Sequence, residues 1–185
     1  MSQLRLLKGG AILFLLTAVS FFLLIFNGFF DPQPVGELVW GQELIAMEVP
    51  AKTENIQWLA QPIPVNDFSV QLTVQFIEGG LDTGYGLILG GEHTHLIVAV
   101  SPLGYAFIQD GDNTIFPWQP WPHIHGTDGP NEIWLNWVDG ELTIRLNREI
   151  IWMGRVAMID GEFGLYAESF AETAVIDFIK MEIRK

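Results

Sequence analysis

Strict alternation of apolar and polar residues over positions 68–76 constrains the fold of this chain more than any other feature. Its apolar residues occupy every second position: Phe68, Val70, Leu72, Val74 and Phe76. Serine, glutamine and threonine fill the positions between them. Because successive side chains of a β-strand point to opposite faces of a sheet, this pattern predicts a strand with one buried and one wet face.

Further strand-like runs follow along the chain, and glycine-rich or acidic turns separate most of them. They cover residues 43–49, 56–59, 85–89, 96–100, 105–109, 132–138, 141–146, 149–153, 162–167 and 173–183. The dipeptide Asp139-Gly140 between two such runs predicts a tight hairpin, because both central positions of that turn need positive φ. Many short strands without a helical period predict an antiparallel sandwich or barrel.

Residues 116–130 form the one long segment without a regular pattern. Four prolines and two glycines in FPWQPWPHIHGTDGP argue against regular structure. Long loops in a compact domain are often functional, so this segment is the first candidate for a binding site.

Residues 9–30 contain no charged side chain. At ~1.5 Å per residue, a helix of this length reaches roughly 33 Å, enough to cross a bilayer core. Its aromatic residues are Phe14, Phe21, Phe22, Phe26, Phe29 and Phe30. Arg5 and Lys8 precede the stretch, and by the positive-inside tendency they predict a cytoplasmic N-terminus and an exported C-terminal domain.

A cleaved signal peptide is the alternative interpretation of this stretch. Signal peptides have a shorter apolar core and a small-x-small cleavage site, and no such site follows here. The preferred division is a cytoplasmic N-terminus (1–8), a single transmembrane helix (9–30), a linker (31–42) and an extracytoplasmic domain (43–185). That domain would lie in the periplasm or at the cell surface.

Composition narrows the classes of partner. All 22 acidic residues follow residue 30, and two of the nine basic residues precede it, so the C-terminal part carries a formal charge of about −15. Such a surface repels the phosphates of nucleic acids, which excludes them as partners. The chain has no cysteine, so disulfides do not stabilise the domain.

Short motifs follow one another in a defined order in the second half of the chain. They are FSVQL from residue 68, GYGLI from 84, PLG from 102, EIWLNWVDGEL from 132, LN at 146–147, GEFGLYA from 161 and IDF from 176. In this order they resemble concanavalin A-like lectin/glucanase domains of the laminin-G-like type, over about residues 43–185. The resemblance implies a jelly-roll sandwich of two antiparallel sheets. Arg148 is a departure, because the family often places glycine there.

Members of that family bind glycans or proteins, and some are glycoside hydrolases. Hydrolytic members of the laminarinase type carry closely spaced carboxylates, Glu-x-Asp-x-x-Glu or Glu-x-Asp-x-Glu, on one strand. The sequence contains neither pattern, so it provides no candidate catalytic pair.

The four histidines form two His-x-His pairs, His93/His95 and His123/His125. On a strand, positions i and i+2 face the same way, so each pair can present two imidazoles together. If the two pairs met, they would make a site for zinc or a similar metal; otherwise they are polar loop residues. The acidic turn at 110–113 is a weaker candidate for calcium. No cofactor is expected, with zinc and calcium as the alternatives.

Tryptophans are the other candidate binding residues. Trp118 and Trp121 lie in the long segment, and Trp134 and Trp137 lie on the hairpin. Alternation puts Trp134 and Trp137 on opposite faces, so one is expected in the core and the other more exposed. Exposed indoles stack on sugar rings and anchor protein interfaces. The alternative is that the loop pair only caps the open end of the sandwich.

These features predict a non-catalytic, membrane-anchored binding or assembly module. The first hypothesis is an accessory subunit that docks on a larger membrane protein complex. The second is a lectin-like protein that binds glycans of the cell envelope through Trp118 and Trp121. A glycoside-processing enzyme is the third. The expected partners are the lipid bilayer, subunits of a membrane complex or a glycan.

Overall fold

The computed structural model describes residues 14–25, 32–91, 94–157 and 160–185. The chain divides into two compact units, Met1–Gln33 and Pro34–Lys185. Each unit is described by itself below.

In the N-terminal unit, residues 14–25 form a helix. Phe14, Phe21 and Phe22 on this helix are exposed. The other predicted anchor residues, Phe26, Phe29 and Phe30, lie outside the described residues. Within the described ranges, no helix combines the length and the apolar character that crossing a membrane requires.

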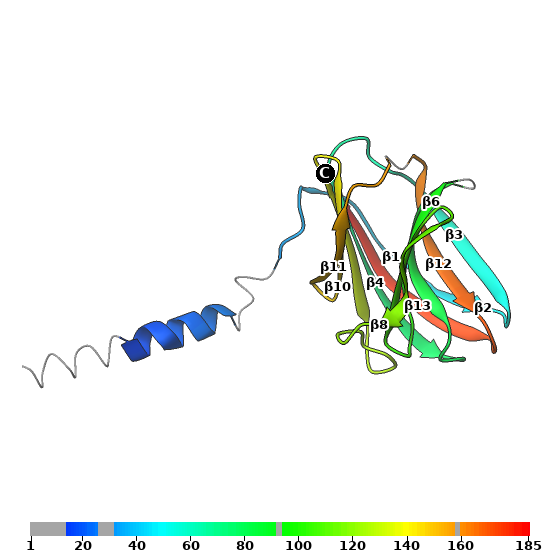
Figure 1. The fold of residues 1–185 in the computed structure, drawn as a ribbon, viewed down its shortest axis with the longest axis horizontal. Coiled ribbons are helices and arrows are strands. Elements are labelled where there is room, and N and C mark those ends of the chain that lie inside the picture. The colour runs from blue at the N-terminus through cyan, green and yellow to red at the C-terminus, as the bar shows by residue number, and fades with distance from the viewer. Residues whose placement is uncertain (1–13, 26–31, 92–93, 158–159) are drawn as a thin grey trace, which may run out of the picture. The chain divides into compact units, whose positions relative to one another are not determined.

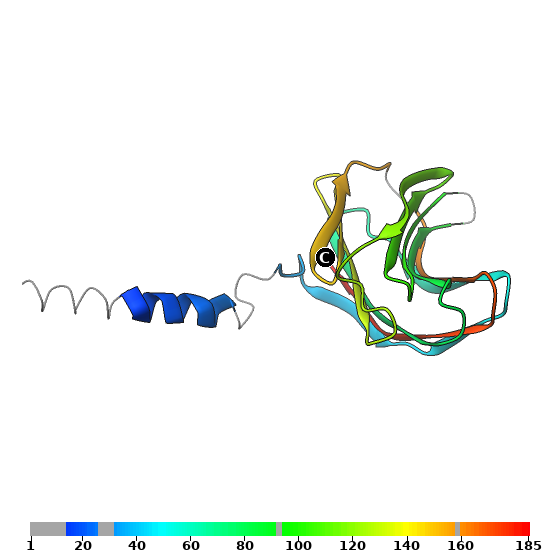
Figure 2. The same ribbon diagram turned by 60° about the horizontal axis from the view of Figure 1, so that its bottom comes forward.

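The C-terminal unit consists of two antiparallel sheets that lie face to face (Figure 1 and Figure 2). Sheet A has the order β1 (Leu38–Glu43), β13 (Ala174–Arg184), β4 (Phe68–Glu78), β9 (Asn131–Val138), β10 (Glu141–Leu146), β11 (Glu149–Gly154), with β2 (Ala46–Val49) also paired to β13. Sheet B has the order β3 (Thr53–Pro62), β12 (Glu162–Ser169), β5 (Gly84–Gly90), β6 (His95–Val100), β7 (Tyr105–Asp110), β8 (Asn113–Pro120). The predicted antiparallel sandwich is confirmed.

The core lies between the sheets, and the alternation of β4 shows how it forms. The apolar residues at alternate positions from Phe68 to Phe76 are at most 4% exposed and belong to the main core cluster. Gln71, Thr73 and Gln75 between them are partly exposed, whereas Ser69 is buried and donates a hydrogen bond to the Val35 carbonyl. All described members of this core lie between Met47 and Ile183, so the Pro34–Lys185 unit builds its core from its own strands.

Two hairpins of sheet A depend on residues with positive φ. Asp139 and Gly140 have φ of 53° and 74° between β9 and β10, as the sequence predicts. Asn147 and Arg148 have φ of 48° and 74° between β10 and β11. Arg148 therefore adopts the conformation that glycine would adopt more easily.

Two strands extend into segments predicted to be irregular. β1 begins at Leu38, inside the predicted linker, because it pairs with β13 at the far end of the chain. β8 runs to Pro120, so the first part of segment 116–130 is a strand. Both prolines of β8 lie on an edge strand, where a missing N–H is tolerated.

Sheet B carries a second apolar layer on its outer face. Ile88, Ile97, Ala99 and Tyr166 are buried there, and Ile56, Trp58, Phe107 and Trp118 cover them. A Cβ built at Gly84 would lie 2.8 Å from the Trp118 indole. Glycine at position 84 therefore lets the indole from edge strand β8 lie directly on β5.

Candidate functional site

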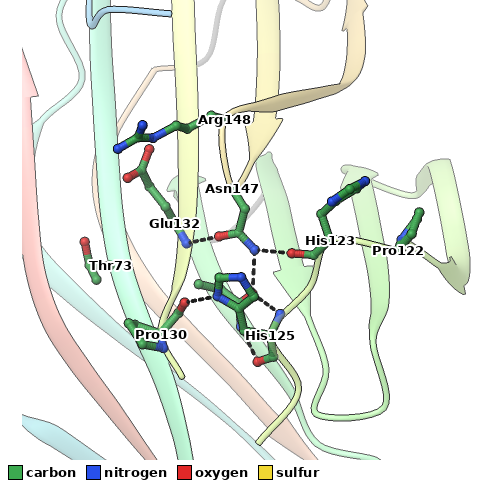
Figure 3. Close-up of a pocket in the computed structure, with 9 residues that line it drawn as sticks. Thr73, Pro122, His123, His125, Pro130, Glu132, Asn147 and Arg148 are labelled. Carbon is green, nitrogen blue, oxygen red and sulfur yellow. Dashed lines mark hydrogen bonds between the residues drawn. The ribbon is translucent and has the colours of Figure 1, made fainter. Parts of the chain in front are cut away.

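A cavity of about 490 Å³ lies between the segment that follows β8, the middle of β4, the start of β9 and the turn after β10 (Figure 3). The lining residues are Thr73, Pro122, His123, His125, Pro130, Asn131, Glu132, Asn147 and Arg148. Most of these side chains are polar or charged. The connection 121–130 forms one wall, and sheet A with its β10–β11 turn forms the other.

Asn131, the first residue of β9, holds the middle of this connection in place. It is 1% exposed. Its Oδ1 accepts a hydrogen bond from the His125 backbone N–H at 2.8 Å, and its Nδ2 donates to the His125 carbonyl at 3.0 Å. Nδ2 also lies 3.5 Å from the Tyr85 hydroxyl on sheet B. One buried amide thus satisfies loop backbone groups that would otherwise lack partners.

Asn147 makes the second set of contacts. Its Oδ1 accepts from the Glu132 N–H at 2.8 Å, and its Nδ2 donates to the His123 carbonyl at 2.5 Å and to Asn131 Oδ1 at 2.9 Å (Figure 3). The side chain therefore joins the β10–β11 turn, the start of β9 and the loop. The amides of both asparagines are hydrogen-bonded to other groups of the protein, so they hold the walls of the cavity in place.

The remaining side chains present donors and acceptors to the cavity. Thr73 and Glu132 are cross-strand partners on β4 and β9. His125 Nδ1 lies 2.8 Å from the Pro130 carbonyl, which only accepts, so Nδ1 carries a proton and a neutral ring has Nε2 as an acceptor. In Figure 3, Arg148 and Glu132 extend on one side of Asn147 and His123 lies on the other.

His123 takes part in one more contact at the rim. Its Nε2 lies 3.3 Å from Glu149 Oε1, and both side chains are about half exposed. An exposed pair of this kind contributes little stability, so its effect is to hold the imidazole at one edge of the cavity. The arrangement suits a ligand with several hydroxyl groups, which can pair with both donors and acceptors.

Among the described residues, the structure does not bring His95 to the pair His123/His125. His95 begins β6 and pairs with Gly90 of β5. Tyr85, whose hydroxyl lies beside the Asn131 amide that binds His125, is also on β5 and pairs with Val100 of β6. Five residues of strand separate these positions, roughly 16 Å. His93 lies outside the described residues. The described residues contain no group of three metal-ligating side chains.

The candidate calcium turn closes the β7–β8 hairpin. Within it, Gln109 Nε2 donates to the Gly111 carbonyl at 2.7 Å, and Gly111 has a φ of 54°. This is the backbone of a tight turn, which accounts for the glycine and the polar residues there.

The two tryptophans of the long segment face different parts of the molecule. Trp118 stacks on Phe107 on the outer face of sheet B, with ring centroids 4.9 Å apart. Trp121 instead packs against the main core, edge-on to Phe116 at 6.3 Å. The two indoles therefore do not share one surface, because β8 still alternates at Trp118 and the chain has turned by Trp121.

The hairpin tryptophans lie on opposite faces of β9, but neither is freely exposed. Trp137 packs against the core and stacks on Phe68 at 6.4 Å. Trp134 faces outward, yet it is only 2% exposed, with the Arg145 guanidinium 5.8 Å from its ring centroid. The cation covers the indole, so the expected exposure of the outward ring is wrong.

Sequence patterns identified only part of the cavity lining: His123 and His125 were candidates, whereas its residues from sheet A and the β10–β11 turn were not. Thr73 and Glu132 look like the wet faces of two strands, and Asn147 and Arg148 look like a turn. One signal was available: Asn131 follows the proline-rich segment at the first position of a strand, where a buried amide can fix a loop.

Neither a family model nor a curated protein matches the sequence. Solved structures do match the fold. A carbohydrate-binding module from Bacillus subtilis has a TM-score of 0.57 and 13% identity, covering 81% of this chain and 97% of its own. The catalytic domain of an endo-1,3-β-glucanase (laminarinase) from Thermotoga petrophila has a TM-score of 0.56 and 8% identity, covering 83% and 99%.

The fold is that of the concanavalin A-like β-sandwiches. A laminarinase from a Flavobacterium gives a TM-score of 0.52 at 9% identity, covering 76% of this chain and 78% of its own. At these identities the likeness concerns the fold. Similar concanavalin A-like structures include both binding modules and hydrolases, so the fold does not decide whether the chain is an enzyme.

Proposed function

We propose that this concanavalin A-like domain is a non-catalytic glycan-binding module that holds a sugar unit in the polar cavity. The observation that carries the proposal is the pair of asparagines. Asn131 and Asn147 fix the backbone around the cavity, so its other polar side chains are held ready before a ligand arrives.

The chemistry of the lining matches a carbohydrate. Each sugar hydroxyl donates one hydrogen bond and accepts others, so it pairs best with a mixed set of partners. Glu132 and His125 Nε2 accept, Arg148 donates, and Thr73 does both. The volume of about 490 Å³ falls within the range of roughly 300–1,000 Å³ that is usual for small-ligand sites.

The lining favours binding over hydrolysis. Glycoside hydrolysis by the common route needs two carboxyl groups on either side of the scissile bond. Of the described residues that line the cavity, Glu132 alone carries a carboxylate. We therefore assign Glu132 the role of hydrogen-bond acceptor for sugar hydroxyls.

The predicted anchor at residues 9–30 would display this domain on the outer side of a membrane, within reach of envelope glycans. This location rests on the sequence pattern. Docking on a larger membrane complex likewise stays a prediction from the sequence.

The test is calorimetric titration of the Pro34–Lys185 unit with β-1,3-glucan, β-1,4-glucan and fructan oligosaccharides. We expect at least one series to bind, and Glu132→Gln to weaken that binding about tenfold, because a charged acceptor contributes more than a neutral one. Glu141→Gln is the matched control, since Glu141 is exposed and lies at the opposite end of the β9–β10 hairpin.

Two results would contradict the proposal. One is equal affinity of the Glu132→Gln and Glu141→Gln variants for the bound glycan, which would move the site elsewhere. The other is release of new reducing ends from the oligosaccharides, which would make the domain an enzyme.

A further inference from the structure

A second, chemically different pocket lies at the end of sheet B. It has a volume of about 190 Å³ and is lined by Asp82, Ser101, Leu103, Tyr105, Trp118 and Phe170. Three of these six residues are aromatic, and Asp82 carries the one charge. None of them lines the polar cavity.

The aromatic walls are held by contacts within sheet B. One face of the Trp118 indole stacks on Phe107 with an interplanar angle of 16°, and its edge lies on Gly84. Tyr105 begins β7, and its carbonyl accepts a hydrogen bond from the Ser101 N–H at 2.9 Å, which closes the 101–104 turn. The rings therefore belong to regular structure and a tight turn.

Two apolar side chains on the rim are open to solvent. Leu103 is 56% exposed, and Phe170, which follows β12, is 45% exposed. Exposed apolar groups around a hollow lose contact with water when a ligand fills it.

Asp82 brings a negative charge to this apolar surface. Its turn is closed by Thr83, whose N–H and hydroxyl both donate to the Gly80 carbonyl at 3.2 and 2.7 Å. Within the part of the chain that the structure describes, the Asp82 carboxylate has no hydrogen-bond or ion-pair partner. The surface of the pocket is nevertheless almost entirely apolar, so its aromatic side chains, and not the Asp82 carboxylate, form its walls.

We propose that this pocket binds a quaternary ammonium group such as the trimethylammonium group of choline. Aromatic faces attract cations, and an alkylated ammonium also fills an apolar pocket with its methyl groups. A sugar ring would find few polar partners here, and an uncharged apolar group would not gain from the attraction between a cation and the aromatic rings. The formal charge of about −15 on residues 31–185 raises the local concentration of cations.

Two sources can supply this group: a soluble choline-type solute and the headgroup of a choline lipid. They share the chemistry that the pocket recognises. The experiment therefore has one arm for each source.

The first arm titrates the Pro34–Lys185 unit with choline and with 3,3-dimethylbutanol, which has the same shape without the charge. We expect choline to bind about 2- to 30-fold tighter, because only the charged group is attracted by the aromatic rings. Trp118→Leu keeps an apolar side chain but removes the aromatic face, and we expect it to weaken choline binding about tenfold.

Asp82→Asn tests the charge. We expect a several-fold loss of choline affinity and a weaker dependence on salt, because one charge pair is removed. Asp112→Asn in the exposed β7–β8 turn is the matched control and should bind as the unaltered domain does. Circular dichroism verifies that each variant is folded.

The second arm compares sedimentation with phosphatidylcholine vesicles and with phosphatidylglycerol vesicles. Selective sedimentation with phosphatidylcholine, lost in Trp118→Leu, supports the pocket and identifies the lipid source; binding of free choline alone supports it with a soluble source. Equal affinity for choline and 3,3-dimethylbutanol, binding of neither choline nor vesicles, or full binding by the folded Trp118→Leu variant would overturn the proposal. Glu132→Gln should leave choline binding unchanged, so this test is independent of the glycan site.

Discussion

At the scale of single residues, Arg148 shows how local strain and a binding surface coincide. A non-glycine residue with a φ of 74° is held in a conformation that costs roughly 1 kcal/mol or more. The same residue lines the polar cavity. Strain of this kind persists where the surrounding structure imposes it, and it is common at functional sites.

Arg148→Gly should therefore separate stability from binding. We expect the free energy of unfolding in urea to rise by about 0.5–1 kcal/mol, because glycine adopts this φ without strain. Glycan affinity should fall about tenfold as the guanidinium is lost. Lys52→Gly is the control: Lys52 also has positive φ (61°) but does not line the cavity, so only stability should rise. Unchanged glycan affinity in Arg148→Gly would remove Arg148 from the site.

Tyr85 is a buried core residue whose ionisation makes the stability of the domain depend on pH in the alkaline range. Burial raises the pKa of Tyr85 to about 12 from its usual 10.0. The folded state then holds this proton more tightly than the unfolded state. Its contribution to stability is complete below about pH 10 and is lost as the pH rises to about 12, at up to ~1.4 kcal/mol per pH unit.

Tyr85→Phe should reduce this alkaline slope, measured as the free energy of unfolding between pH 9 and pH 12. Burial also raises the pKa of Tyr166, so part of the slope should persist in the variant. An unaltered slope would show that Tyr85 ionises equally easily in the folded and unfolded states.

At the scale of elements, the connection between β8 and β9 is ordered by side chains from other elements. Asn147 in the β10–β11 turn bonds to the His123 carbonyl, the Glu132 N–H and Asn131. A segment with so many prolines forms few hydrogen bonds of its own. Its position therefore depends on Asn147 in the turn of a neighbouring hairpin as well as on Asn131 at the start of β9.

Asn147→Gly should loosen this connection without disturbing the turn. Glycine accepts the φ of 48°, while the side-chain hydrogen bonds are lost. We expect the free energy of unfolding to fall by about 1–3 kcal/mol and amide exchange in residues 121–130 to accelerate. Asp139→Gly alters the equivalent position of the β9–β10 turn and should leave exchange in 121–130 unchanged. Equal exchange in both variants would contradict this role of Asn147.

At the scale of the whole molecule, the chain joins an uncharged N-terminal stretch to an acidic sandwich. The two parts differ in charge, since residues 9–30 carry none while residues 31–185 carry about −15. We therefore expect the first part to determine where the protein is located and propose that the second part carries its binding site.

Membrane fractionation tests this division. We expect the full chain to stay in the membrane pellet after an alkaline carbonate wash, because an apolar span is not released by high pH. The Pro34–Lys185 unit should stay in the supernatant. Release of the full chain by carbonate would contradict the anchor, and a shortened mature protein would indicate a cleaved signal peptide.

The features that depend on residues close together in the sequence could be predicted from the sequence. Alternation from Phe68 to Phe76 assigned the core face of β4, and Asp139-Gly140 placed a hairpin turn, because strand periodicity and turn geometry are local properties. Together with the order of the motifs, they predicted an antiparallel sandwich of the concanavalin A-like kind.

The contacts between residues far apart in the sequence are known only from the tertiary structure. β1, near the start of the domain sequence, pairs with β13 at its end. Asn131 contacts Tyr85, His125 and Asn147, which belong to separate elements. The tryptophans show the same limit, since Trp118 and Trp121 are near neighbours in the chain but face different apolar layers. Periodicity predicts the face on which a side chain lies, but the partner on that face depends on strand order and on the path of the loops.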